Sequence, residues 1–475
     1  MDKYKQSFID FLLETKSLKV GADFTLKSKR LSPYFINVGD FNEGETISRL
    51  GQAYATAIEN SGKEVDILFG PAYKGIPLAL ATSIALASNG RNVGFAFDRK
   101  EEKDHGEVTN KADLQKAILV GKNISNGAKV IILDDVFTTG NTKYEAIDLI
   151  NKLAENVDYT AVVIAVNRQE VGINGVSAID EFTAKTGIPV PSIVKITDIY
   201  NHLKTKSNLN QKDVERIATY LRVYGTKEAR DALGTPLEKR IIELDRSVIP
   251  ACDVEDLEQF EDIVKSTADI EKIGGYKIGF ELGYGGLGWG LADVVRTAKK
   301  YTNKPIIFDH QKAGTDIPDT GKNFARKMKK AGVDAVILFP QAGPETERAW
   351  IYHALDNDLN VIVGGRMTHP AYAVSEGGFI TDEGALDMYR IAARAGVTNF
   401  VVPGNKPEVI TQIREVIEAE GVSPIFYSPG FVAQGGKLSD AVKAAGNSFH
   451  GIVGRGIYAA KDKKRQAAIE LTSQL

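Results

Sequence analysis

The chain has 475 residues, of which 59 are Lys or Arg and 62 are Asp or Glu, so its formal net charge is −3. A charge this balanced gives no global electrostatic reason for binding nucleic acid or an anionic membrane, and we expect neither partner. The single cysteine excludes an intrachain disulfide and a Cys-rich zinc site. The length and the ordinary hydrophobic content of 43 % predict about two large globular domains.

The beginning of the chain predicts an amphipathic helix that carries acidic residues, which is not the pattern of a signal or transit peptide. The longest uncharged apolar run, residues 76–88, is too short for a bilayer, which needs about 20 residues. We therefore expect a cytoplasmic protein.

Short apolar runs alternate with helical patterns through the first half of the chain, which predicts a parallel α/β sheet covered on both faces. The predicted strands are residues 66–70, 93–97, 130–133 and 160–166. The charged segment 204–239 has no strand pattern and predicts one or two helices that close this domain. We place the first domain at 1–225, a linker at 226–237 and the second domain at 238–475.

Eight apolar runs separated by helical stretches follow in the second half. The predicted strands are residues 241–245, 276–279, 305–309, 335–338, 360–365, 399–404, 424–430 and 451–456. Eight β–α repeats in about 240 residues are typical of a TIM (β/α)8 barrel. The alternative is a doubly wound open sheet, which the absence of a Gly-rich dinucleotide fingerprint disfavours.

The sharpest motif of the first half is Val-Ile-Ile-Leu-Asp-Asp-Val-Phe-Thr-Thr-Gly-Asn-Thr at 130–142. It predicts a buried strand ending in two carboxylates, Asp134 and Asp135, and then a loop of small residues that opens a helix. Ligands of open α/β sheets bind at the carboxyl ends of strands, and such a loop offers N–H groups and hydroxyls to a phosphate. The carboxylates suit ribose hydroxyls or Mg²⁺. The alternative is that they and Thr138 only cap a helix.

This motif resembles the 5-phosphoribosyl 1-pyrophosphate (PRPP) motif of type I phosphoribosyltransferases. The resemblance becomes specific to orotate phosphoribosyltransferase and covers about residues 1–205. The other matching strings are Phe-Thr-Leu-Lys-Ser at 24–28, Ser-Pro-Tyr-Phe at 32–35, Gly-Pro-Ala-Tyr-Lys-Gly-Ile-Pro at 70–77, Arg-Lys-Glu-Glu-Lys-Asp-His-Gly-Glu at 99–107 and Asn-Arg-Gln-Glu at 167–170.

The resemblance implies a type I phosphoribosyltransferase fold and a reaction of orotate with PRPP that needs Mg²⁺, bound with PRPP near the two aspartates. Segment 99–107 would close over the pyrophosphate and reach into a neighbouring subunit, which implies a homodimer or larger homo-oligomer. By itself, such a charge run is usually a solvated turn. Segment 108–126 is longer than we expect at this place. The implied catalytic residues are Lys103 and His105, and the implied substrate-binding residues are Lys27, Phe35, Tyr73, Lys74, Arg99, Lys100, Asp134, Asp135, Thr138, Thr139, Gly140, Thr142 and Arg168.

Charged residues in the second half gather at the predicted carboxyl ends of strands, where barrel enzymes carry their catalytic groups. Asp245 ends the first predicted strand, Lys277 lies on the second and Asp309 ends the third. The string Asp-His-Gln-Lys-Ala-Gly-Thr-Asp-Ile-Pro-Asp-Thr at 309–320 adds Lys312 and Asp316. Such an alternating array is costly unless it is paired or used. The alternative is a surface ion pair between Asp309 and Lys312.

This half resembles orotidine 5′-monophosphate (OMP) decarboxylase over about residues 240–460. The matching strings are Ile-Glu-Leu-Asp at 242–245, Tyr-Lys-Ile-Gly at 276–279, the 309–320 segment, Met-Thr-His-Pro at 367–370, Ser-Pro-Gly at 428–430 and Gly-Arg-Gly at 454–456. The resemblance implies cofactor-free decarboxylation with Lys312 as proton donor, Asp309 and Lys277 in the charged array, and Asp316 with Thr320 from the partner subunit. The implied substrate-binding residues are Asp245, Lys277, Thr320, Thr368, Pro429, Gly430, Gln434, Gly454 and Arg455.

One spacing departs from the family pattern, which is Asp-x-Lys-x-x-Asp, because this chain has Asp-x-x-Lys-x-x-x-Asp. A bulge after the strand would re-aim the lysine. The departure leaves open a sibling decarboxylase or aldolase that acts on another sugar phosphate, and a PRPP-sensing regulator is an alternative for the first domain. Together the two resemblances imply a bifunctional enzyme similar to uridine monophosphate (UMP) synthase, with orotate, PRPP and OMP as substrates.

Overall fold

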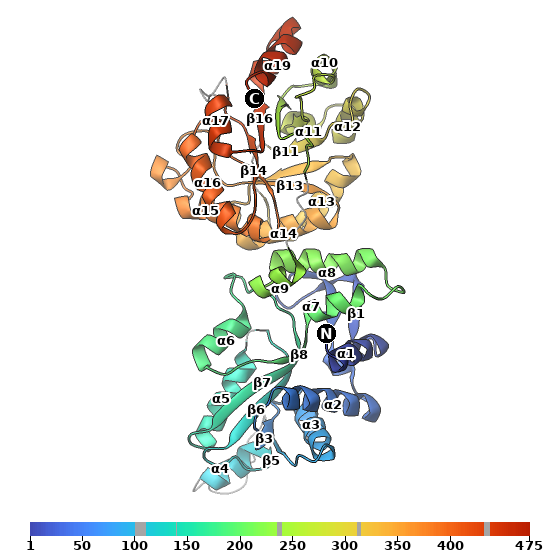
Figure 1. The fold of residues 1–475 in the computed structure, drawn as a ribbon, viewed down its shortest axis with the longest axis vertical. Coiled ribbons are helices and arrows are strands. Elements are labelled where there is room, and N and C mark those ends of the chain that lie inside the picture. The colour runs from blue at the N-terminus through green and yellow to red at the C-terminus, as the bar shows by residue number, and fades with distance from the viewer. Residues whose placement is uncertain (100–110, 139, 235–239, 311–314, 432–437) are drawn as a thin grey trace. The chain divides into compact units, whose positions relative to one another are not determined.

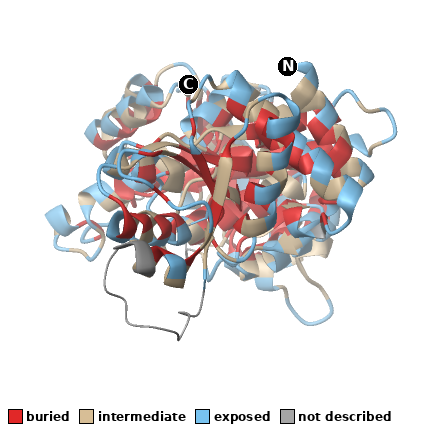
Figure 2. Cartoon of the chain, turned by 90° about the horizontal axis from the view of Figure 1, so that it is seen from below, coloured by how far each residue is buried: buried red, intermediate tan, exposed pale blue. Residues whose placement is uncertain are grey.

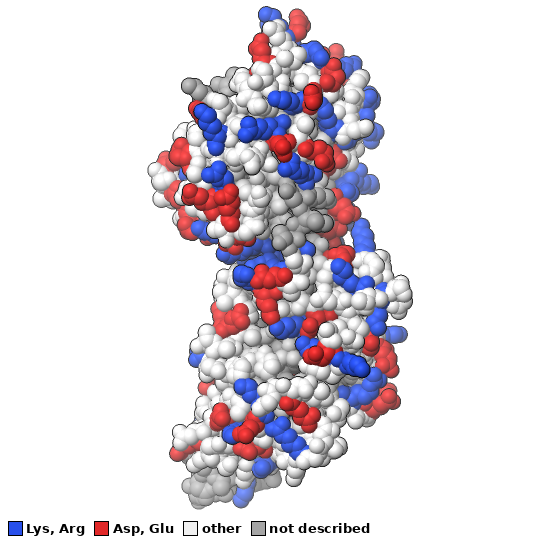
Figure 3. All heavy atoms as spheres, in the orientation of Figure 1, with Lys and Arg blue, Asp and Glu red and all other residues white. Residues whose placement is uncertain are grey.

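The computed structural model describes residues 1–99, 111–138, 140–234, 240–310, 315–431 and 438–475. The chain divides into two compact units, Met1–Leu233 and Gly234–Leu475 (Figure 1). Among the described residues, no helix combines the length and the apolar character that crossing a bilayer requires. Basic and acidic side chains are interspersed on the face of each unit that Figure 3 shows, in keeping with the small net charge.

The first unit is built on a six-stranded sheet with the order β5-β4-β3-β6-β7-β8. All neighbours are parallel except β4 and β5, which are antiparallel. Its strands are β3 Ile67–Phe69, β4 Gly94–Asp98, β5 Leu119–Gly121, β6 Lys129–Val136, β7 Asp158–Asn167 and β8 Ser192–Lys195. The four strands predicted here are therefore confirmed, and their central residues are buried because helices flank the sheet.

A separate antiparallel hairpin, β1 Leu18–Thr25 with β2 Leu31–Ile36, lies outside this sheet. Its first strand is mostly exposed, so it lacks the continuous apolar run that revealed the central strands. The helices of the unit are α1 Lys3–Glu14, α2 Gly44–Asn60, α3 Gly75–Ser88, α4 Lys111–Ile118, α5 Asn141–Leu153, α6 Ala178–Thr186, α7 Ile196–Leu203, α8 Gln211–Tyr224 and α9 Lys227–Leu233, with a 3₁₀ turn at Val38–Asp40.

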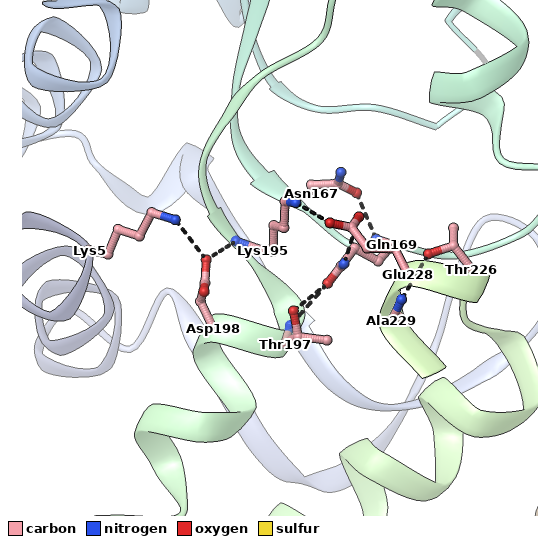
Figure 4. Close-up of polar contacts among 9 residues, drawn as sticks. All are labelled: Lys5, Asn167, Gln169, Lys195, Thr197, Asp198, Thr226, Glu228 and Ala229. Atoms are coloured by element: carbon pink, nitrogen blue, oxygen red, sulfur yellow. Dashed lines mark hydrogen bonds and ion pairs between the residues drawn. The ribbon is translucent and has the colours of Figure 1, made fainter. Parts of the chain in front are cut away.

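Helix α9 belongs to the first unit, so this unit extends beyond the predicted boundary at residue 225. Figure 4 shows how α9 is attached. Glu228 accepts a hydrogen bond of 3.1 Å from the Gln169 side chain and forms an ion pair with Lys195. The Gln169 amide oxygen in turn accepts from the hydroxyl of Thr197 at 2.8 Å. These contacts tie α9 to the carboxyl ends of β7 and β8, which the polar sequence of the segment did not reveal.

The second unit is a closed barrel of eight parallel strands in the order β9 to β16, which confirms the predicted architecture. Its strands are β9 Arg246–Cys252, β10 Tyr276–Ile278, β11 Ile306–Asp309, β12 Ala335–Leu338, β13 Asn360–Gly364, β14 Asn399–Val401, β15 Ile425–Ser428 and β16 Phe449–Val453. Apolar side chains of the barrel, among them Ile307, Ile362 and Tyr427, form one buried cluster.

The first barrel strand was predicted one segment too early. Residues 241–245 form bends, and the strand that closes the barrel is Arg246–Cys252. The run contains Pro250, and a proline argues against a central strand because it has no N–H to donate. Here Pro250 lies opposite Val453 within the β9–β16 pairing. The correction moves the carboxyl end of this strand from Asp245 to Asp253.

Helices follow the barrel strands. They are α10 Leu257–Thr267, α11 Phe280–Tyr284, α12 Leu291–Lys299, α13 Thr320–Ala331, α14 Pro344–Asp356, α15 Asp382–Arg394, α16 Pro407–Ala419, α17 Leu438–Ala445, α18 Arg455–Tyr458 and α19 Lys464–Thr472, with 3₁₀ turns at Val374–Glu376 and Lys461–Lys463. Buried residues concentrate on the strands and on the helix faces that pack against them (Figure 2).

Candidate active sites

The two neighbouring carboxylates of the first unit lie at the carboxyl end of β6, as predicted. Asp135 forms an ion pair of 2.7 Å with Lys74, which precedes α3 and whose side chain is 63 % exposed. The N–H of Asp135 donates to Oδ1 of Asp134 at 2.8 Å. The structure therefore brings together three of the predicted binding residues, which come from the ends of two adjacent strands, β3 and β6.

Asp134 has a partner that the sequence reasoning missed, because its carboxylate forms an ion pair with Lys143 of α5. Burial raises the pKa of the Asp134 carboxyl, as does the charge of Asp135, while Lys143 lowers it. The ammonium of Lys143 also donates to the carbonyl oxygen of Val136 at 3.1 Å. In the sequence, this partner could have been recognised only from its place, a lysine in the first turn of the helix that follows the two aspartates, and that place matched no motif.

The loop after β6 turns sharply into α5. Gly140 has φ +79°, and a Cβ there would lie 2.9 Å from the ring of Phe137, so this turn requires glycine. Thr138 and Thr142 flank the turn and are exposed. An exposed hydroxyl on each side of a helix N-terminus suits a phosphate, as the motif predicted.

Arg168 follows β7 and is held by the hairpin and by its own strand. Its guanidinium donates to Glu170 at 2.6 and 2.9 Å and lies over the ring of Tyr34, whose hydroxyl donates to the same carboxylate. Burial alone would lower the pKa of this guanidinium, but Glu170 raises it above its ordinary value. The predicted base wall, Phe35, is half-buried and stacks against Phe24 within the hairpin.

The remaining predicted residues of the first site lie at its rim or outside the described residues. Three of them are exposed: Lys27 lies at the hairpin turn, Tyr73 before α3 and Arg99 after β4. The predicted residues that lie outside the described part of the chain are Lys100, Lys103, His105 and Thr139.

In the barrel, Lys277 is buried between two carboxylates at the ends of neighbouring strands. Its ammonium is 3.1 Å from Oδ1 of Asp253, directly after β9, and 3.2 Å from Oδ2 of Asp309, the last residue of β11. Burial alone would lower the pKa of Lys277, but the two carboxylates outweigh it and raise the pKa above its ordinary value. The ammonium is therefore a fixed charge, as the predicted array requires.

Asp253 takes the place that the sequence analysis gave to Asp245, and the Asp245 prediction was wrong. Asp245 precedes β9, at the opposite end of the strand, and pairs with Arg240 at 2.6 Å with its side chain 73 % exposed. Asp253 follows Pro-Ala-Cys, the true end of the strand. The sequence did offer a signal, because the Asp253 carboxylate directly follows an apolar run. It was overlooked because residues 241–245 were interpreted as the strand.

A cavity of about 200 Å³ opens beside Lys277. The predicted residues that line it are Lys277, Asp309, Pro429, Gly430, Gly454 and Arg455, and the additional ones include Asp253, Phe431 and Tyr458. Gly430 has φ +113°, and a Cβ there would lie 2.9 Å from Cγ2 of Thr368, so the close contact between the loop after β15 and Thr368 requires glycine. The cavity thus has a buried charged side and, at the loops after β15 and β16, a glycine-rich side with one guanidinium.

Besides Asp245, three predicted residues that the structure describes, Asp316, Thr320 and Thr368, lie apart from this cavity lining. Asp316 is exposed, and Thr320 begins α13, where its hydroxyl donates to the carbonyl oxygen of Ile317 at 2.8 Å. Lys312 and Gln434 lie outside the described residues. Cys252 is buried and its thiol pKa is raised by burial, which agrees with an inert packing role.

Comparison with known proteins finds a matching family model for each unit. Residues 38–183 match the model described as phosphoribosyl transferase domain, and residues 246–469 match the model described as orotidine 5′-phosphate decarboxylase / HUMPS family. Orotate phosphoribosyltransferase of Marinobacter nauticus is 44 % identical over 225 residues, which are 47 % of this chain and 100 % of the relative. The Vibrio cholerae protein of the same name is 43 % identical over 226 residues, again 47 % of this chain and 100 % of the relative.

Solved structures match each unit as well. Orotate phosphoribosyltransferase of Francisella tularensis covers 46 % of this chain and 100 % of its own, with 35 % identity and a TM-score of 0.40. Orotidine 5′-monophosphate decarboxylase of Methanocaldococcus jannaschii, complexed with inhibitor BMP, covers 48 % of this chain and 98 % of its own, with 26 % identity and a TM-score of 0.42.

The fold and the two sites define a phosphoribosyltransferase-type α/β unit joined to a decarboxylase-type (β/α)8 barrel. Through its first unit the chain belongs to the orotate phosphoribosyltransferase family. The barrel matches the model of the orotidine 5′-phosphate decarboxylase / HUMPS family over nearly its whole length, and that match begins at the first residue of β9. Neither the regulator nor the other sugar-phosphate alternative gains support from these comparisons.

Proposed function

We propose that this chain catalyses two consecutive steps of pyrimidine biosynthesis. The first unit joins orotate to PRPP and yields OMP and pyrophosphate. The barrel then decarboxylates OMP to UMP. The observation that carries this proposal is the buried Lys277, held by Asp253 and Asp309 beside a cavity whose other side carries Arg455. A fixed cation near a remote anion-binding loop is what a phosphorylated substrate that develops a carbanion needs.

In the first unit, the exposed ammonium of Lys74 is available to the pyrophosphate of PRPP, and Asp135 beside it is available to the ribose hydroxyls. The Gly140 turn and the hydroxyls of Thr138 and Thr142 suit the 5′-phosphate. Arg168, with its guanidinium already planar and oriented by Glu170, suits the carboxylate or imide edge of orotate.

Mg²⁺ is part of the proposed first step. Among the described residues, no group of three or more His, Cys, Asp or Glu side chains could form a metal cage. The carboxylates of Asp134 and Asp135 are each already paired with a lysine. These residues therefore fit an ion that arrives on the pyrophosphate oxygens and keeps water ligands, which is how Mg²⁺ usually binds. Bound there, it would neutralise the leaving pyrophosphate.

In the barrel, loss of CO₂ leaves a pair of electrons at C6 of the pyrimidine, and no electron sink is required if an ammonium stands beside that carbon. We assign the proton transfer to Lys312 and the support of the array to Lys277, whose ion pair with Asp309 orients that carboxylate. Arg455 and the glycine loops grip the phosphate, and this remote binding energy helps to assemble the site.

We further propose a homodimer formed through α3. This helix has no charged residue, yet Leu80 is 41 % and Ile84 is 61 % exposed. An uncharged helix with an exposed apolar face suits a second copy of the same surface. Because α3 begins directly after Lys74, such a contact would bring the partner next to the first site. Sedimentation of Leu80→Glu, expected to be monomeric, tests this.

The experiment on the proposed function follows orotate by absorbance in the presence of PRPP and Mg²⁺, and then CO₂ release from added OMP. Activity in both assays supports the proposal, whereas OMP formation without CO₂ release would contradict the assignment of the barrel. Lys312→Ala should abolish CO₂ release and leave OMP formation intact. Lys327→Ala is the matched control, because this exposed lysine lies on α13 of the same unit and should change neither rate.

A further inference from the structure

The first unit contains a buried lysine that neither the motifs nor the proposed reaction uses. Lys143 lies in the first turn of α5, and its side chain is 3 % exposed. A cation is unfavourable near a helix N-terminus, because that end of the helix dipole is positive. Burying an ammonium also costs solvation energy unless it is paired. A position that opposes both preferences calls for a specific reason.

The reason lies in the contacts of its ammonium. It pairs with Oδ2 of Asp134 and donates to the carbonyl oxygen of Val136 at 3.1 Å. The ring of Phe137 covers another side, with its centre 5.1 Å from the nitrogen. The other carboxylate oxygen, Oδ1, accepts the N–H of Asp135 at 2.8 Å. Both oxygens of Asp134 are therefore used inside the protein.

The neighbouring carboxylate is arranged differently. Oδ2 of Asp135 pairs with Lys74, whose side chain is 63 % exposed, while the side chains of Asp135 and Asp134 are similarly covered, at 11 % and 13 % exposed. Oδ1 of Asp135 accepts the N–H of Val136 at 2.8 Å. Two adjacent aspartates thus form two unlike ion pairs, one with a buried lysine and one with an exposed lysine that solvent and ligands can reach. The hydroxyl of Tyr54 on α2 also lies near Asp134 and donates to its backbone carbonyl at 2.7 Å.

We propose that Lys143 is a positioning residue for binding of the phosphoribosyl donor, because it fixes Asp134 as an internal support and leaves Asp135 as the carboxylate that meets the ribose hydroxyls. The inference rests on the proposed function of the first unit and divides the roles within the double aspartate. Asp134 orients Asp135 by accepting its N–H in the 2.8 Å hydrogen bond, and Lys143 balances the charge of Asp134. Asp135 exchanges its bond to Lys74 for bonds to the sugar.

Lys143→Met in the full chain tests this role, because methionine keeps the length and loses the charge. We expect the KM for PRPP to rise by about tenfold, as for one lost charge-assisted contact. The kcat and the KM for orotate should stay within about threefold, because the ribose contact is made equally in the ground state and in the transition state. Lys143→Arg should recover most of the affinity, since it restores the cation.

Two controls separate positioning from general damage. Lys152→Met alters an exposed lysine of the same helix and should leave both KM values unchanged. CO₂ release from OMP, which the barrel of the same chain performs, should be unaffected in every variant. If Lys143 only supported folding, Lys143→Met would lower kcat through loss of active protein at an unchanged KM for PRPP, and this result would overturn the inference.

The double variant Lys143→Met with Asp134→Asn completes the test. Asp134→Asn alone leaves the ammonium of Lys143 buried without a counter-charge, so the double variant should bind PRPP better than the product of the single effects predicts. Purely additive effects would contradict the coupling. Absence of OMP formation in the unaltered chain would defeat the proposed function itself, whereas normal turnover with an unaltered KM in Lys143→Met would defeat only this inference.

Discussion

Replacing Asp253 with asparagine tests the corrected position of the barrel site. The change keeps the shape of the side chain and removes its negative charge 3.1 Å from the ammonium of Lys277. The matched control is Asp245→Asn, the same chemical change at the other end of the same strand. We expect the first variant to lose decarboxylation and the second to keep it.

The size of the effect follows from burial. Lys277 has a side chain only 6 % exposed and is held by two carboxylates, so one of its two charge-assisted bonds is weakened in Asp253→Asn. A hydrogen bond to a charged group contributes about 1.5–3 kcal/mol, which corresponds to about a 10- to 150-fold fall in kcat/KM. Asp245 is 73 % exposed and pairs with Arg240, and exposed pairs contribute about 0–1 kcal/mol to stability.

The assay is CO₂ release from OMP over a range of substrate concentrations, with OMP formation from orotate and PRPP as the internal standard for intact protein. Thermal unfolding of each variant shows whether the barrel remains folded. The reasoning would be refuted if a folded Asp253→Asn variant decarboxylated OMP within twofold of the unaltered chain. It would equally be refuted if Asp245→Asn lost as much activity as Asp253→Asn.

Three further changes give separate tests. Gly430→Ala should lower CO₂ release by at least about tenfold and spare OMP formation, because an alanine at φ +113° is strained by about 1–3 kcal/mol and its Cβ would press on Thr368; steady-state assays of both reactions check this. Burial lowers the pKa of His450 from 6.5 to about 3, so between these pH values the unfolded chain binds a proton that the folded chain does not. The free energy of unfolding should therefore fall by about 1.4 kcal/mol for each pH unit below 6.5, down to about pH 3. His450→Asn should reduce this pH dependence, which unfolding measured between pH 7 and pH 5 checks. Lys74→Met should raise the KM for PRPP by about tenfold because the exposed cation beside Asp135 is lost, and isothermal titration with PRPP measures the change.

Most strands of the central sheet and of the barrel were predictable to within a few residues, because both of their faces are covered by other parts of the structure. Runs such as Val130–Leu133 and Ala335–Leu338 are apolar because every side chain is buried, and burial therefore shows in composition alone. The β1–β2 hairpin was missed because its first strand is mostly exposed. Helices α8 and α9 confirm the one or two helices predicted within residues 204–239, but the sequence did not show that α9 is attached to the first unit, because its contacts through Glu228 are polar and involve residues far along the chain.

The site residues divide in the same way. Lys277 and Asp309 were identified because charged residues inside apolar strands are rare and conspicuous in sequence. Asp253 was missed because residues 241–245 were interpreted as the strand, so that Asp245 rather than Asp253 was placed at its carboxyl end. Lys143 was missed because nothing in local sequence distinguishes a buried lysine on a helix from an exposed one such as Lys152.

The sequence by itself determined the two-unit α/β organisation, the (β/α)8 barrel and the identity of most groups at the strand ends, because periodicity and motif spacing are local properties of the chain. Only the tertiary structure decided which end of a strand each carboxylate occupies and which cation it meets. Asp253 and Asp245 are both aspartates near one strand, yet closure of the barrel puts the first against Lys277 and the second at the surface. Likewise, the tertiary structure pairs one of two adjacent aspartates with the buried Lys143 of α5 and the other with the exposed Lys74.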